Sequence, residues 1–178
     1  MATLPPPMSY EIPSITMESD ARLRTIWLSI IAAFLFNMLP WHDLQGVPDL
    51  VALAVLFWSI HQPHRFSVGS AFCAGLLLDA ANGVLLGQHA LACSALAFAG
   101  NELSRRVLGF GLRAQAFHVV VLLLLAQALM LAVRIAMGGT FPGVAWFASS
   151  LIATLFWPLA SFAHRFGRQV GRSADPSN

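Results

Sequence analysis

The stretch that decides the fold runs from Pro48 to Ala90 and reads PDLVALAVLFWSIHQPHRFSVGSAFCAGLLLDAANGVLLGQHA. Two apolar segments are joined by the turn Pro63-His64-Arg65, and a glycine-broken loop from Gly83 to Gly87 leads into a third segment. A carboxylate, Asp79, lies near the end of the second segment. A charged group in an apolar helix is costly unless it is paired, hydrated or near an interface. We therefore expect the rest of the chain to hold this stretch in place.

The amino-acid composition indicates whether the chain is surrounded by water or by lipid. Of 178 residues, 57% are hydrophobic and 10% are charged, whereas soluble domains average about 25% charged residues. So few polar side chains cannot cover a water-soluble globule. The sequence therefore predicts an all-α integral membrane protein.

Apolar runs bounded by glycines, prolines and arginines predict six transmembrane helices in a single domain over residues 22–166. A helix needs about 20 apolar residues to cross a bilayer, or somewhat fewer where the bilayer thins. Residues 1–21 are polar and proline-rich and are expected to form a disordered leader, and residues 167–178 a polar tail. The expected helices span about residues 25–40, 48–61, 66–81, 88–104, 114–137 and 142–164.

Arginine placement predicts the orientation. In the six-helix arrangement only Arg134 falls on one side. By the positive-inside rule the other side is cytoplasmic, so both termini are expected there. The arginines on that side are Arg22, Arg24, Arg65, Arg105, Arg106, Arg113, Arg165, Arg168 and Arg172.

Several function classes find no support in the sequence. The net charge of +2 is small, and no soluble basic face exists for nucleic acid. No nucleophile with a base, phosphate loop, metal-ligand spacing or cofactor motif is recognisable, so the sequence predicts no enzyme and no catalytic, cofactor or metal residues. Cys73 and Cys93 lie in apolar segments and are interpreted as small buried hydrophobes.

Three charged residues are candidates for a structural or partner-binding role. Asp79 either makes an essential contact inside the protein or reaches headgroup water at the outer end of its helix. Asp49, in the first turn of a helix, is expected to be a capping residue. Arg134 either pairs with Asp79 or Asp49 near the outer boundary or snorkels to the surface.

Small residues mark a second set of candidates. Gly69, Ala71 and Gly75 have the kind of spacing that lets two helices approach closely in lipid. Gly83 and Gly87 can adopt positive φ or form a short re-entrant turn.

A series of short motifs follows in order along the chain: Met38-Leu39-Pro40-Trp41, Pro48-Asp49-Leu50-Val51, Phe57-Trp58, Pro63-His64-Arg65, Val68-Gly69, Gly75, Leu78-Asp79, Gly83, Leu86-Gly87, Ala90-Leu91, Phe141-Pro142, Trp146 and Trp157-Pro158. Together with the features above, the order of these motifs resembles the bacterial rod shape-determining MreD family. The resemblance covers about residues 22–168.

The resemblance implies a multi-pass protein of the bacterial inner membrane that binds MreC. With MreC and MreB, such a protein works alongside the RodA glycosyltransferase and a penicillin-binding transpeptidase in sidewall peptidoglycan synthesis. It also implies a fold similar to the six-helix substrate-binding components of energy-coupling-factor transporters. Membrane lipids are further expected partners, and a homo-oligomer within the larger complex stays open.

Two functions are therefore expected to compete. The first is a non-enzymatic assembly factor whose outward-facing groove, around Asp79 and the loop from Gly83 to Gly87, grips a partner's helix. The second is a transporter-like subunit that binds a small molecule or lipid in the same helix cavity. Few polar groups are expected at membrane depth, chiefly Asn37, Gln127 and Ser94, and this scarcity favours the first.

Overall fold

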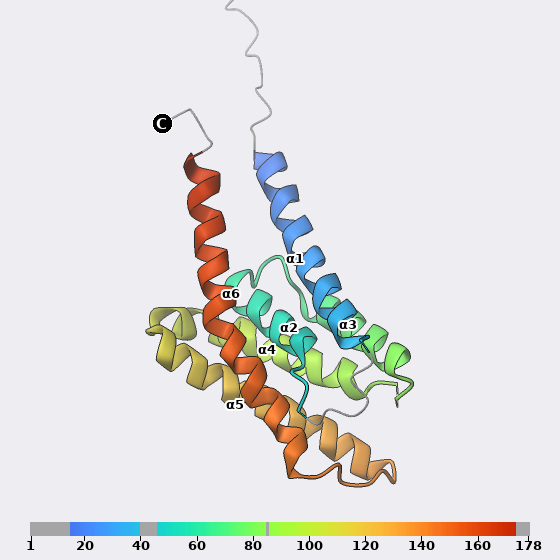
Figure 1. Ribbon diagram of the computed structural model, residues 1–178. Helices are drawn as coiled ribbons and strands as arrows, with labels where there is room; N and C mark the ends of the chain where they lie inside the picture. The colour runs from blue at the N-terminus through green and yellow to red at the C-terminus, as the bar shows by residue number, and fades with distance from the viewer. Residues whose placement is uncertain (1–14, 40–45, 85, 174–178) are drawn as a thin grey trace, which may run out of the picture.

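The computed structural model of the protein describes residues 15–39, 46–84 and 86–173. Within these ranges all regular structure is helical, and Figure 1 shows how the helices are arranged. The elements are α1 (Ile15–Asn37), α2 (Leu50–His61), α3 (Val68–Asn82), α4 (Gln88–Gly109), α5 (Leu112–Ala136), the 3₁₀ helix η1 (Val144–Phe147) and α6 (Ala148–Ser173). The prediction of an all-helical protein with six α-helices is confirmed for this part of the chain.

Three helices are longer than the apolar pattern predicts. α1 begins at Ile15 rather than near residue 25, α4 continues to Gly109 rather than about 104, and α6 continues to Ser173 rather than about 164. The prediction ended these helices where arginines appear. Arginine is a strong helix former, so polarity marks where a helix leaves the apolar zone and not where it stops. Predictions for residues 1–14, 40–45 and 174–178, including Trp41 and much of the leader, lie outside the described residues.

The short helix α2 ends where its sequence predicts and begins at Leu50, two residues later than expected. Asp49 is its N-cap, and the carboxylate accepts a hydrogen bond from the backbone N–H of Ala52 at 3.0 Å. The helix ends at His61, two residues before Pro63, whose ring disfavours helical conformation in the preceding residue. The expected capping role of Asp49 is therefore correct.

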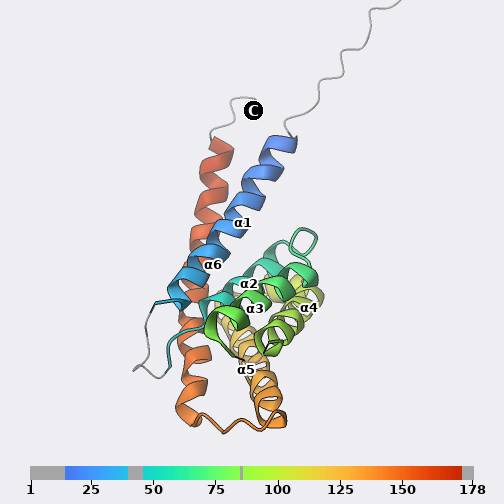
Figure 2. The same ribbon diagram turned by 90° about the vertical axis from the view of Figure 1, so that its right-hand side faces the viewer.

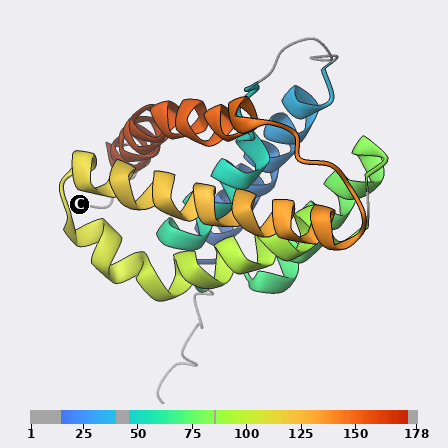
Figure 3. The same ribbon diagram turned by 90° about the horizontal axis from the view of Figure 1, so that it is seen from below.

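Helices α2 and α4 form the centre of the bundle. α4 packs against α2, α3 and α5, while α1 packs on α2 and α6 packs on α5 and α2. In the end-on view of Figure 3, α5 and α4 lie side by side in front of the rest. Figures 1 and 2 show the start of α1 and the end of α6 at the same end of the molecule. The opposite end holds the end of α5 and the start of α6.

Two glycines let α4 approach its neighbours closely. A Cβ atom at Gly75 of α3 would lie 2.5 Å from the carbonyl oxygen of His89 and 2.6 Å from the Cα of Ala90. A Cβ atom at Gly100 of α4 would lie 2.8 Å from the Cβ of Ser59 on α2. Because real Cβ atoms do not approach backbone this closely, α3 and α4 can pack as they do only with glycine at position 75.

The surface of the bundle is apolar along most of its helices. Leu77, Phe98, Phe117 and Leu155 are well exposed on α3, α4, α5 and α6. Two segments, Leu112–Ala136 and Val144–His164, are long and apolar enough to cross a membrane. A surface of this kind requires lipid or another apolar partner around it.

Candidate functional site

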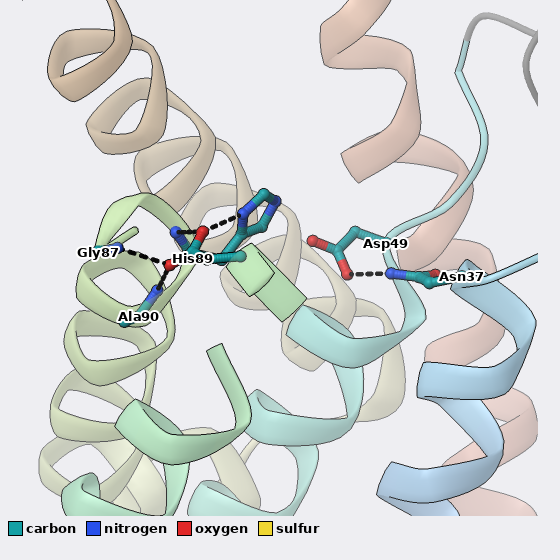
Figure 4. A network of polar contacts seen from close by, with 6 residues as sticks. Asn37, Asp49, Gly87, His89 and Ala90 are labelled. Carbon is teal, nitrogen blue, oxygen red and sulfur yellow. Dashed lines mark hydrogen bonds and ion pairs between the residues drawn. The ribbon is translucent and has the colours of Figure 1, made fainter. Parts of the chain in front are cut away.

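Asp79 is fully buried, and it caps the start of α4 from the end of α3. One oxygen accepts hydrogen bonds from the backbone N–H groups of Gly87 (2.8 Å) and Ala90 (3.2 Å). The other accepts from the backbone N–H of His89 (2.8 Å) and lies 2.7 Å from the ring Nδ1 of His89. Figure 4 shows Gly87, His89 and Ala90 gathered around this carboxylate. The side chain therefore does not reach headgroup water.

The backbone around Asp79 explains why a carboxylate is needed there. The first N–H groups of a helix have no partner within it, and they carry the positive end of the helix dipole. The N-cap residue of α4 is Gly87, which has φ of +106° and offers no side chain to cap the helix. The missing acceptor comes from Asp79, whose own carbonyl ends α3 by accepting from Val84 at 3.2 Å. One residue thus joins the end of α3 to the start of α4.

Next to this cap, the bundle contains a cavity of about 650 Å³. Its wall comes from the end of α1, the segment before α2, the end of α3, and parts of α4, α5, η1 and α6. Polar lining residues on these elements include Asn37, Asp49, His89, Gln127, Ser149 and Ser150. This is more polar lining than the sequence predicts.

Asn37 and Asp49 form one polar pair of the cavity. The Asn37 side-chain N–H donates to Asp49 Oδ1 at 3.2 Å, and the same oxygen accepts the capping bond from Ala52. The Asn37 side-chain oxygen is buried and has no hydrogen-bond partner in the part of the chain that the structure describes. In Figure 4, the Asp49 oxygen that does not bond Asn37 is directed toward His89.

A second polar group connects α5 to α6. The Gln127 side-chain N–H groups donate to the carbonyl of Trp146 at 2.8 Å and to Ser149 Oγ at 2.6 Å. Its oxygen accepts from Ser150 Oγ at 2.5 Å. Gln127, Ser149 and Ser150 are each buried, so their hydrogen bonds satisfy one another within the apolar bundle.

The predicted stripe of small residues is divided between two surfaces. Ala71 and Gly75 are buried, and Gly75 contacts the start of α4. Gly69 is exposed, and a Cβ atom there would meet only Ser67 Oγ, at 3.7 Å. Gly83 and Gly87 both have positive φ, as the loop interpretation anticipates, and both face open space.

Of the two alternatives for Arg134, pairing with Asp79 or Asp49 is not seen among the described residues. Among the described residues Asp79 pairs with His89, and no ion pair involves Arg134 or Asp49. Arg134 lies instead in the last turn of α5, where its side chain and carbonyl pack against Gly139. The sequence argument placed the three charges near one boundary but could not tell which helix faces they occupy.

Several contacts had little or no signal in the sequence. His89 is one of six histidines spread along the sequence, and it follows the Gly83–Gly87 loop and contacts Asp79. His61 of α2 and His164 of α6 also lie close, with ring centroids 5.1 Å apart. Within the described residues no three His, Cys, Asp or Glu side chains are grouped in a way that could hold a metal ion. Ser149 and Ser150, an adjacent polar pair in an apolar segment, were the one detectable signal that was missed.

These features define a class of protein. A helical bundle with exposed apolar side chains along α1, α3, α4, α5 and α6, and with two segments able to span a bilayer, is a helical membrane protein.

Within that class the chain belongs to a specific family. Residues 22–164 match the family described as rod shape-determining protein MreD. The chain is also 29% identical over 138 residues to the rod shape-determining protein MreD of Haemophilus influenzae, and the alignment covers 75% of this chain and 84% of that protein. No solved structure matches the chain significantly. The resemblance inferred from the sequence is therefore confirmed, and the role of the family is rod shape determination.

Proposed function

We propose that the protein is a non-enzymatic membrane subunit of the cell-elongation machinery that binds MreC. In this role it works with MreB, RodA and a penicillin-binding transpeptidase in sidewall peptidoglycan synthesis. The observation that carries the proposal is the family match over residues 22–164, which includes every described helix in whole or in part.

The contact surface that we propose for MreC is the outer face of α3. This helix packs chiefly on α4, so its other side is left uncovered by the helices that the structure describes. Gly69, Phe72, Cys73, Leu76 and Ala80 are exposed and recur at helical spacing along that side. Small residues at positions 69 and 73 let a second helix approach closely, which is how helices associate in lipid. Ala71 and Gly75, on the buried side, hold α3 in place.

Bulky substitutions on this face test the proposal. Gly69→Leu and Cys73→Phe are expected to abolish co-purification of MreC and to give rounded cells, while the protein still inserts in the membrane. Ala132→Leu, at an exposed small residue of α5, is the matched control and is expected to keep both properties. Full MreC binding and normal rods in both α3 variants would rule out this surface.

We further propose that the protein crosses the inner membrane six times with both termini in the cytoplasm. Support comes from the arginine distribution and from the location of the start of α1 and the end of α6 at one end of the bundle. Reporter fusions at each terminus and at Gly139 test this topology. Cytoplasmic reporters should be active at both termini and inactive at Gly139, and a periplasmic signal at either terminus contradicts the proposal.

A second candidate function is favoured by the cavity. Its volume of about 650 Å³ lies within the range of about 300–1,000 Å³ typical of small-molecule sites, and several polar groups converge on it. In this alternative the protein is a binding subunit for a small molecule or lipid, similar to the substrate-binding components of energy-coupling-factor transporters. A ligand retained by the purified protein in native mass spectrometry would support this function.

A further inference from the structure

The polar groups of the cavity wall leave hydrogen-bond acceptor positions unused. The N–H groups of Gln127 and the hydroxyl hydrogens of Ser149 and Ser150 are spent on hydrogen bonds within the α5–α6 group. The carboxylate of Asp49 has one oxygen engaged with Ala52 and Asn37, and among the described residues no hydrogen bond engages the other. A carboxylate oxygen can only accept hydrogen bonds, so it calls for a donor.

The ring of His89 lies across the cavity from this oxygen. Its Nδ1 atom is held 2.7 Å from the Asp79 carboxylate, which also accepts three backbone N–H groups. Since a carboxylate accepts and does not donate, Nδ1 carries the hydrogen, and a neutral ring presents Nε2 as a second acceptor. Figure 4 shows His89 and Asp49 facing each other, with Asn37 hydrogen-bonded to Asp49 on the side away from His89.

The charge on the cavity wall is negative, so it also favours a hydrogen-bond donor as the ligand. Asp49 contributes a carboxylate, and no Lys or Arg occurs among the described residues of the wall. The N-terminus of α2 offsets part of that charge through its dipole. The corresponding end of α4 is already neutralised by Asp79. The remaining negative charge of the Asp49 carboxylate favours a positively charged donor over an anion.

The inner part of the cavity is apolar. Both leucines that line it lie away from the ends of their helices: Leu96 follows His89 by about two turns along α4, and Leu123 precedes Met130 by about two turns along α5. Ala52, Ala126 and Ala153 leave space between them, because their side chains are small. A suitable ligand therefore has a compact apolar body as well as a charged donor.

We propose that this cavity binds an organic ammonium ion, with the N–H groups held between Asp49 and His89 and the apolar body directed toward Leu96 and Leu123. The inference rests on the second candidate function and names its ligand class. A free alkylamine and the headgroup of phosphatidylethanolamine share the ammonium group, and the experiment below separates these two sources.

Thermal unfolding of the full chain in nanodiscs of phosphatidylglycerol tests the proposal. Hexylammonium chloride is expected to raise the melting temperature with saturation, while hexanoate and hexanol have little effect. Asp49→Asn keeps an N-cap oxygen for α2 but removes the charge, and we expect about tenfold weaker binding of hexylammonium. Glu102→Gln removes an exposed carboxylate elsewhere and is expected to bind like the wild type.

A second variant acts through volume rather than charge. Ala126→Leu fills part of the cavity without touching Asp49, and it is expected to reduce the hexylammonium response even if Asp49→Asn does not fold. Equal responses to hexylammonium and hexanol would mean apolar filling only and would overturn the proposal. So would no response in the wild type, or an unchanged response in both variants.

Lipid exchange identifies the natural source. If the headgroup is the ligand, nanodiscs containing phosphatidylethanolamine raise the melting temperature without added amine and diminish the hexylammonium response. If a free amine is the ligand, the hexylammonium response is the same in both lipids. Co-purification of MreC with the same variants distinguishes the proposal of ammonium binding in the cavity from the proposal of MreC binding. A wild type that binds MreC but does not respond to the amine overturns only the cavity proposal.

Discussion

Replacing Asp79 is the sharpest test of how the bundle is held together. Asp79→Ala removes an acceptor from three backbone N–H groups and from the ring of His89. A hydrogen bond to a charged group contributes about 1.5–3 kcal/mol, and a lost helix cap costs about 0.5–2 kcal/mol. The Gly87 N–H is only half-buried and can form a hydrogen bond to water in the variant. The free-energy cost of losing all four hydrogen bonds is therefore less than the sum of their separate contributions. We expect the free energy of unfolding to fall by about 3–5 kcal/mol.

Asp79→Asn refines this test because it preserves the shape of the side chain. The amide retains one acceptor oxygen but points an N–H₂ group at backbone donors, so we expect a loss of about 1.5–3 kcal/mol. The assay is reversible denaturant unfolding in detergent micelles, followed by far-ultraviolet circular dichroism. Glu102→Gln serves as the control for loss of a carboxylate on an exposed surface. If Asp79→Ala unfolds within about 0.5 kcal/mol of the wild type, Asp79 is not the cap that joins α3 to α4.

Two further substitutions probe helix contacts in the same unfolding assay. Gly75→Ala places a Cβ atom 2.5 Å from the His89 carbonyl and is expected to cost about 1–3 kcal/mol, whereas Gly69→Ala at an exposed helical site is expected to stabilise by about 0.5–1 kcal/mol. A neutral Gly75→Ala would mean that α3 and α4 do not approach as described. Gln127→Leu leaves Ser150 without its acceptor and is expected to cost about 1–3 kcal/mol, and equal stability would show that this α5–α6 group is dispensable.

The helices could largely be predicted from the sequence because their signals are local. Pro48, Asp49 and Pro63 set the bounds of α2 through chain stiffness and capping, which involve residues only a few positions apart. The ends of α1, α4 and α6 were misplaced for a local reason as well. Apolar composition reports where a helix meets lipid, but arginine-rich segments continue as helix beyond that point.

The site was less predictable because its contacts join distant parts of the chain. Asp79 was recognised as an exceptional residue, but its partner could have been water, Arg134 or a backbone donor. Only the packing of α3 on α4, permitted by Gly75, brings the carboxylate to the start of α4. The polar group of Gln127 and Ser150 likewise spans 23 residues and exists because α5 and α6 pack together.

By itself, the sequence determined that this chain is helical, belongs in lipid and is a member of the MreD family. These conclusions depend on composition and on the order of motifs, and both can be read from the sequence without knowing which residues are in contact. The tertiary structure alone decided which charges meet, since a side chain's partner depends on the face that each helix turns to its neighbours. It placed Asp79 in the protein interior as a cap for α4 and left one oxygen of Asp49 facing a cavity. That difference separates a carboxylate that holds the fold from one that is available to a ligand.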